Sequence, residues 1–341
     1  MKRFLSIKSI LLICLLGIIA CLIGCTPSVS IHTGTITGII NVYSPYAEGY
    51  MLGAARVDVL GEGIFTVSSF SDGTYTLNNV PAGQYTITAI KHGYTTAQQV
   101  VNVVEGQTVA NVDFNLETNT TAEEVGGVYY YGFNINIAPL NNLKIRQAIN
   151  YAIDKQTLIN EINTEFSVNK VVAQGPISPS MIGYNSSLAG YPYDVVEAQT
   201  LLSQAGYPEG FNTDLYYNVS DYHSSIAQKI QTYLAQVGII VELHGVEWNE
   251  LTDSISQGEL SLFRMSWIAD TPDPTDFLYS FYHSASISNH THYNNSTIDS
   301  MIEQAWGTID ETEFIQLIQQ IESTTVNDAP AIFLYYYQEM K

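Results

Sequence analysis

The spacing of apolar residues changes near residue 120, and this change constrains the fold more than any other feature of the chain. Over 34–116, apolar and polar residues alternate between Gly, Pro and Asn, a pattern typical of short strands. Over 128–341, runs with helical spacing alternate with short strand-like runs, which favours an α/β architecture. The polar segment 117–127 between them is interpreted as a linker with some hinge freedom. The sequence therefore predicts a multidomain protein, with an all-β sandwich followed by an α/β lobe.

Composition excludes several classes of protein. Apolar residues make up 46% of the chain and charged residues 13%, which rules out a disordered chain and a coiled coil. The 33 acidic and 12 basic residues give a net charge of −21, which argues against nucleic acid as a partner. The catalytic motifs of serine hydrolases, phosphate-loop enzymes and zinc proteases are absent, so we expect no enzyme and no cofactor.

The N-terminus is typical of a secretory signal. Three of the first eight residues are basic, and an apolar run of 14 residues, Ile10–Ile23, follows them. This run is shorter than the ~20 residues that span a bilayer. Leu22-Ile23-Gly24-Cys25 resembles a prokaryotic lipobox, which implies a lipoprotein signal peptide at 1–24, a lipid on Cys25 and a tether at 25–33. The lipid would hold the protein on the outer face of a membrane. An ordinary signal or an uncleaved anchor is the alternative.

The β-module carries recognisable motifs. The strings Gly53-Ala-Ala-Arg-Val57, Ser71–Ile87 and Lys91-His-Gly-Tyr94 resemble those of the carboxypeptidase regulatory-like domain. That resemblance implies a transthyretin-like sandwich that acts as a spacer without catalysis, and adhesion is the alternative. Seven strands are predicted, at 34–42, 55–59, 65–67, 74–77, 84–90, 97–103 and 107–116.

The lobe contains a predicted βαβ unit. Its strands are expected at 213–218 and 239–245, with a helix at 225–236 between them. A crossover of this kind makes the two strands parallel neighbours in one sheet. Open α/β sheets bind ligands beyond the carboxyl ends of such strands. A further strand at 260–267 should reach the same edge.

Several segments of the lobe resemble family 5 of the extracellular solute-binding proteins. The resemblance covers 128–341 and only the second part of a family member. It implies a type II periplasmic-binding-protein fold and a role in an ABC importer, with peptides or another small solute as ligand and a permease as partner. The motifs are Gly132-Phe-Asn-Ile-Asn136, Leu143–Lys155, Ala198–Pro208, Trp267–Pro274 and His292–Asp299.

The same resemblance implies which residues contact a peptide. Asp270 would hold the amino group, Arg264 the carboxylate, and His223 a second side of that carboxylate. Trp248 would be an aromatic residue of the cleft, and Ile255 occupies the place of a further expected base. Two more ligand contacts are predicted from their motifs, Trp267 and Asn134.

Independent reasoning from the residues leaves alternatives open. Arg264 lies in an apolar strand, so its charge either pairs internally or binds a ligand. Asp270 follows the strand end but could instead be a turn residue, and His223 could be a solvated residue at a helix start. Asp273 is interpreted as turn chemistry.

Other functions remain as hypotheses. His290 and His292 could contribute to a metal site, which is the nickel alternative, although no metal is expected. A surface adhesion lipoprotein with a degenerate half-cleft is a second hypothesis. A product of gene fusion that retains half of a binding protein is the third.

Overall fold

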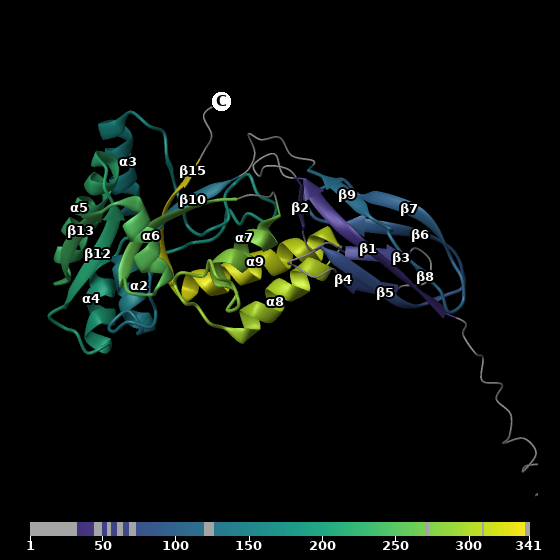
Figure 1. The fold of residues 1–341 in the computed structure, drawn as a ribbon. Coiled ribbons are helices and arrows are strands. Elements are labelled where there is room, and N and C mark those ends of the chain that lie inside the picture. Colours follow the sequence, from purple (N-terminus) through teal and green to yellow (C-terminus); the bar gives the residue numbers. More distant parts are fainter. Residues whose placement is uncertain are drawn as a thin grey trace, which may run out of the picture.

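The computed structural model describes residues 33–43, 50–52, 56–59, 64–67, 73–118, 126–269, 273–308 and 310–337, and for 50–52, 56–59 and 64–67 it describes the backbone alone. These residues form two parts, a pair of packed β-sheets that ends at residue 118 and an α/β lobe that begins at residue 126 (Figure 1). None of the helices in these ranges combines the length and the apolar character that crossing a bilayer requires.

The N-terminal part consists of two sheets. In one, β1 pairs with β2, β5, β8 and β9, and the other has the order β4-β3-β6-β7. One core lies between them, and Ile36, Ile87 and Phe114 are among its fully buried members. The strands are β1 (Thr33–Tyr43), β2 (Tyr50–Leu52), β3 (Arg56–Val59), β4 (Ile64–Val67), β5 (Thr74–Pro81), β6 (Gly83–Ile90), β7 (Ala97–Val103), β8 (Thr108–Val109) and β9 (Phe114–Glu117).

The end of this module differs from the predicted single strand at 107–116. The chain instead forms β8 and β9, because Asn111 adopts a left-handed backbone with φ of 62° and interrupts the extended run. The intervening segment runs close to β1, where a Cβ on Gly38 would lie 2.0 Å from the carbonyl oxygen of Val112. β2 is also a strand that the alternating pattern did not predict.

The lobe is built on a six-stranded mixed sheet with the order β11-β15-β10-β14-β12-β13. β12 pairs in parallel with both β13 and β14, which confirms the predicted βαβ unit. β10 pairs antiparallel with β14 and β15, and all seven of its residues are buried. The strands are β10 (Gly127–Phe133), β11 (Val171–Val172), β12 (Asn212–Asn218), β13 (Ile240–Val246), β14 (Leu262–Ile268) and β15 (Ala331–Tyr337).

Helices cover both faces of this sheet (Figure 1). Alternate residues of β10 point to the two faces, so Tyr129 joins the core under α2–α5 and Tyr130 joins the core under α6–α9. The helices are α2 (Leu143–Tyr151), α3 (Lys155–Phe166), α4 (Val195–Gln204), α5 (Asp221–Ala235), α6 (Trp248–Ser256), α7 (Pro274–Tyr282), α8 (Ser296–Gly307) and α9 (Glu311–Asn327).

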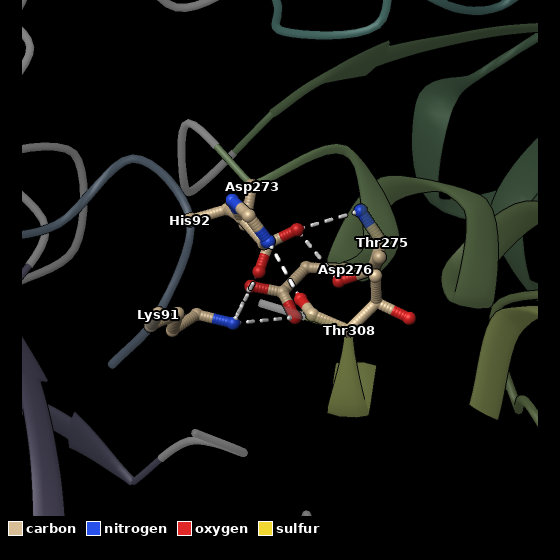
Figure 2. Close-up of polar contacts among 6 residues, drawn as sticks. All are labelled: Lys91, His92, Asp273, Thr275, Asp276 and Thr308. Carbon is tan, nitrogen blue, oxygen red and sulfur yellow. Dashed lines mark hydrogen bonds and ion pairs between the residues drawn. The ribbon is translucent and has the colours of Figure 1, made fainter. Parts of the chain in front are cut away.

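A buried ion pair joins the sandwich to the lobe (Figure 2). Lys91, in the turn after β6, places its ammonium 2.7 Å from a carboxylate oxygen of Asp273 and 3.3 Å from Asp276. Burial alone would lower the pKa of Lys91, but the two carboxylates raise it above its ordinary value, so the ammonium stays charged. Asp273 also caps α7 by accepting a hydrogen bond from the backbone amide of Thr275, so its predicted turn role is only part of its function.

The neighbouring His92 extends this contact. Its ring stacks on Phe314 of α9 with 3.6 Å between ring centroids, and its Nε2 lies 2.8 Å from the carbonyl oxygen of Thr308. Phe314 belongs to the core of the lobe, so the turn after β6 packs against a core residue of the lobe. The sandwich is therefore docked on the helical layer of the lobe.

Replacing Lys91 by Met should destabilise the chain by about 3–5 kcal/mol, because Asp273 would be left buried without its cation. Urea unfolding, followed by circular dichroism, measures this loss. The matched control is Lys229→Met, which breaks a more exposed pair with Glu161 and should cost about 0–1 kcal/mol. Equal losses in the two variants would mean that the Lys91 contact does not hold the parts together.

Candidate functional site

The carboxyl ends of three parallel strands meet at one edge of the lobe sheet. β12, β13 and β14 run in the same direction, so residues following Asn218, Val246 and Ile268 gather there. Ligands of open α/β sheets bind beyond such strand ends. This edge is therefore the candidate binding site.

Arg264 of β14 is the central charge of this site. Its side chain is directed toward the α2–α5 face, with its guanidinium carbon 4.7 Å from the ring centre of Tyr129. The guanidinium donates a hydrogen bond of 3.0 Å to Oδ1 of Asn218 and one of 3.4 Å to the hydroxyl of Ser266. The residue is only 6% exposed, and its Nε has no hydrogen-bond partner among the described residues.

No aspartate or glutamate in the described part of the chain forms an ion pair with Arg264. Among the described residues, its positive charge is met by neutral groups, namely a tyrosine face, an amide and a hydroxyl. Buried charges in proteins are normally paired, so this arrangement favours an anionic ligand over the internal ion pair that the sequence also allowed.

His223 and Arg264 both contact the ring of Tyr129. It is in the first turn of α5, where the hydroxyl of Ser220 caps the helix by accepting from the His223 amide. Its Nδ1 lies at hydrogen-bond distance, 3.0 Å, from the Tyr129 hydroxyl. Burial, and then the charge of Arg264, lower the pKa of His223 to about 4, so its imidazole is neutral near pH 7. Arg264 would thus supply the charge and His223 a neutral hydrogen bond.

The helix start adds to the attraction for anions. The N-terminus of α5 carries partial positive charge from its free amides, and it begins directly after β12 at the candidate edge. An anion near Arg264 would therefore meet a cation, a neutral imidazole and a helix N-terminus.

Large apolar side chains surround this edge in exposed positions. Trp248, at the start of α6, is 45% exposed. Such side chains gathered at one edge mark an interaction surface more than isolated ones do. This rim consists of Val171, Val219, Trp248 and Ile268.

Two predicted contact residues lie elsewhere. Trp267 is directed toward the opposite face of the sheet, where its ring packs edge-on against Phe277 and Phe281, because neighbouring strand positions alternate in direction. Asn134 follows the far end of β10, is 2% exposed and donates to the carbonyl oxygen of Gly258. The structure does not bring either side chain together with Arg264.

The remaining predicted residues, Asp270 and Cys25, lie outside the described residues. Ile255, in the place of the expected base, is buried in the lobe core. Within the described residues, no third His, Cys, Asp or Glu joins His290 and His292 in a metal-ligand group.

Sequence reasoning missed Asn218 and Tyr129 as parts of the site. Asn218 is the last residue of a correctly predicted strand, so the rule that ligands bind at strand ends could have found it. Tyr129 lies in an apolar run that gives no sign of which tyrosine faces Arg264.

Comparisons with known proteins identify the family of the chain. The family model described as bacterial extracellular solute-binding proteins, family 5 Middle, matches residues 65–289. Heme-binding protein A of Haemophilus influenzae is 33% identical over 212 residues, which cover 60% of this chain and 38% of that protein. The oligopeptide-binding protein OppA of Bacillus subtilis is 28% identical over 227 residues, 64% of this chain and 41% of that protein. The chain spans about two fifths of the length of these relatives.

Solved structures show the same fold. HbpA2 from Haemophilus parasuis superposes with a TM-score of 0.58 at 26% identity, over 62% of this chain and 42% of that chain. AppA from Bacillus subtilis, in complex with a nonapeptide, superposes with a TM-score of 0.56 at 23% identity, over 62% of this chain and 45% of that chain. These similarities confirm the predicted type II periplasmic-binding-protein fold of the lobe.

The depressed pKa of His223 predicts how stability depends on pH. The unfolded chain takes up a proton below pH 6.5, whereas the folded chain resists it until about pH 4, so stability should fall as the pH falls through this window. Urea midpoints at pH 7, 6, 5 and 4.5 measure the effect. His223→Gln should flatten this part of the profile, and an unchanged slope would contradict a buried neutral imidazole.

Proposed function

The chain belongs to family 5 of the bacterial extracellular solute-binding proteins, and from this premise we propose that it binds peptides through their terminal carboxylate for delivery to an ABC permease. The observation that carries the proposal is Arg264, a buried cation with no acidic partner among the described residues. A carboxylate fits its planar fork, and charge-assisted hydrogen bonds of this kind are the strongest that side chains make. Binding involves no chemical step.

The rest of the ligand would be read less specifically. The body of the ligand would lie against exposed apolar side chains, which do not select for a particular polar side chain. These are Val219, Trp248 and Ile268. Asp270, two positions after β14 in the sequence, is proposed to hold the peptide ammonium, as the resemblance implies. Both ends of a peptide would then be bound by charge, and this suits a receptor that tolerates many side chains.

The N-terminal segments complete the proposal. The Leu22-Ile23-Gly24-Cys25 tetrad after an apolar run supports a lipid anchor on Cys25, which would hold the receptor on the outer face of a membrane. The module at 34–116 is proposed to be a carboxypeptidase regulatory-like, transthyretin-like sandwich. Its docking through Lys91 favours a fixed part of the receptor over a loose spacer.

Haem is a second candidate ligand, because a 33% identical relative is named Heme-binding protein A. Haem also presents carboxylates, which could meet Arg264 in the same way as a peptide terminus. A titration of the full chain with hemin, followed by its visible absorption, separates the two ligands. A saturable spectral change without peptide binding would favour haem.

Arg264→Gln should weaken binding of peptides with a free carboxylate by about 10–100-fold, because a charged hydrogen bond contributes about 1.5–3 kcal/mol. The measurement is calorimetric titration of the full chain with a mixed library of tri- to pentapeptides. The same library with amidated C-termini should bind both the wild type and the variant weakly, with equal affinity.

Two further variants sharpen this test. Arg264→Lys keeps the charge but loses the fork, so it should recover only part of the affinity. Lys144→Met is the control, because it removes an exposed cation that hydrogen-bonds Gln204 on α4, away from the strand ends. Unchanged affinity in Arg264→Gln, in a folded sample, would overturn the carboxylate assignment. Absence of peptide binding by the wild-type chain would favour the adhesion hypothesis.

A further inference from the structure

A second group of ligating side chains lies in the middle of β12 and β13, apart from the Arg264 site. Asp214 of β12 and Glu242 and His244 of β13 bring one ligand atom each to within 4.8 Å of one another. Asp214 lies four residues before Asn218, which corresponds to about 13 Å along an extended strand. The proposed function does not use these residues.

The pairing of the strands puts two negative charges face to face. Asp214 and Glu242 are direct partners in the parallel register, and like charges in such positions destabilise a sheet. Neither carboxylate forms an ion pair with a lysine or arginine of the described residues. An imidazole is the group that faces this carboxylate pair among the described residues.

The imidazole is held in position to serve as a ligand. The ring of His244 stacks on its strand partner Tyr216, with 4.6 Å between centroids and 17° between planes. Its Nε2 lies 2.8 Å from Oδ1 of Asp214, and two donors bound to one small divalent ion lie about 3 Å apart. Side-chain exposures of 30% for His244 and 47% for Asp214 leave the group open to solvent.

We propose that Asp214, Glu242 and His244 bind a divalent transition-metal ion, with water completing its coordination. One imidazole nitrogen and two carboxylate oxygens suit zinc and its neighbours, whereas magnesium and calcium prefer oxygen alone. β13 is the edge strand of the sheet, so the ion would fasten β13 to β12 and remove the repulsion between the carboxylates. The proposal is independent of what binds at Arg264.

Calorimetric titration of the full chain with zinc chloride tests the proposal, with magnesium chloride beside it. We expect one saturable zinc site in the wild-type chain. Its affinity should fall by more than about tenfold in each of three variants, Asp214→Asn, Glu242→Gln and His244→Gln. Loss of a residue that only hydrogen-bonds a metal ligand already lowers metal affinity by about tenfold or more, and these variants remove the ligands themselves. Magnesium should give no saturable heat. The control is Glu303→Gln, which alters another carboxylate that faces a histidine, His283, at 3.4 Å.

A spectroscopic measurement separates this site from a simple ion pair. Copper(II) bound to the full chain should show coupling to a single nitrogen in electron paramagnetic resonance, and His244→Gln should remove that coupling while circular dichroism shows an unchanged fold. If zinc affinity and the copper signal were the same in wild type and in all three variants, the proposal would be overturned. An effect of His244→Gln alone, with none from Asp214→Asn or Glu242→Gln, would also overturn the three-ligand site.

Discussion

The ammonium of Lys91, held between Asp273 and Asp276, is the interaction on which the arrangement of the two parts depends. Burying a lysine is costly unless anions or other polar groups replace its water, and here both carboxylates come from the start of α7, more than 180 residues away in the chain. Asp273 also caps α7, and α7 packs Phe277 and Phe281 against Trp267 of β14. The ion pair therefore links a turn of the sandwich to the strand that carries Arg264. Removing either partner should therefore destabilise both the sandwich turn and the start of α7.

Local patterns predicted the elements of the fold better than their contacts. The βαβ unit was correct because strand and helix periods there are separated by clear turn residues, and a crossover of this kind leaves few alternatives. The division of the predicted strand at 107–116 was missed because the alternating pattern favours one continuous strand, although asparagine adopts a left-handed backbone more readily than most residues. The docking of the sandwich could not be predicted, since Lys91 and His92 look like a solvated turn until Asp273 and Phe314 are placed against them.

The site shows the same limit at the level of single residues. The resemblance to the family singled out Arg264 as a carboxylate contact, and reasoning from the residues added only that an arginine in an apolar strand needs either an internal ion pair or a ligand. The motif that contains Trp267 does not indicate the direction of its ring. The alternation of side chains along a strand does, since positions 264 and 267 must face opposite sides of the sheet. Asn134 lies away from Arg264 for a different reason: the direction of β10 places it at the far end of the sheet, and direction is set by pairing with β14 rather than by local sequence.

The burial of Arg264 and the exposure of the apolar side chains near it determine how the proposed ligand would be recognised. The contacts between sandwich and lobe lie on α7, Thr308 and Phe314, whereas Val219, Trp248 and Ile268 lie at the strand ends. A carboxylate that reaches Arg264 would meet a buried guanidinium with no ion-pair partner among the described residues, and charge-assisted hydrogen bonds of this kind are the strongest that side chains make. In the proposed site the ligand body would lie against the exposed apolar side chains, and apolar burial would contribute in proportion to the area that they cover. Such a site should distinguish a carboxylate from an amide strongly, and one side chain from another weakly.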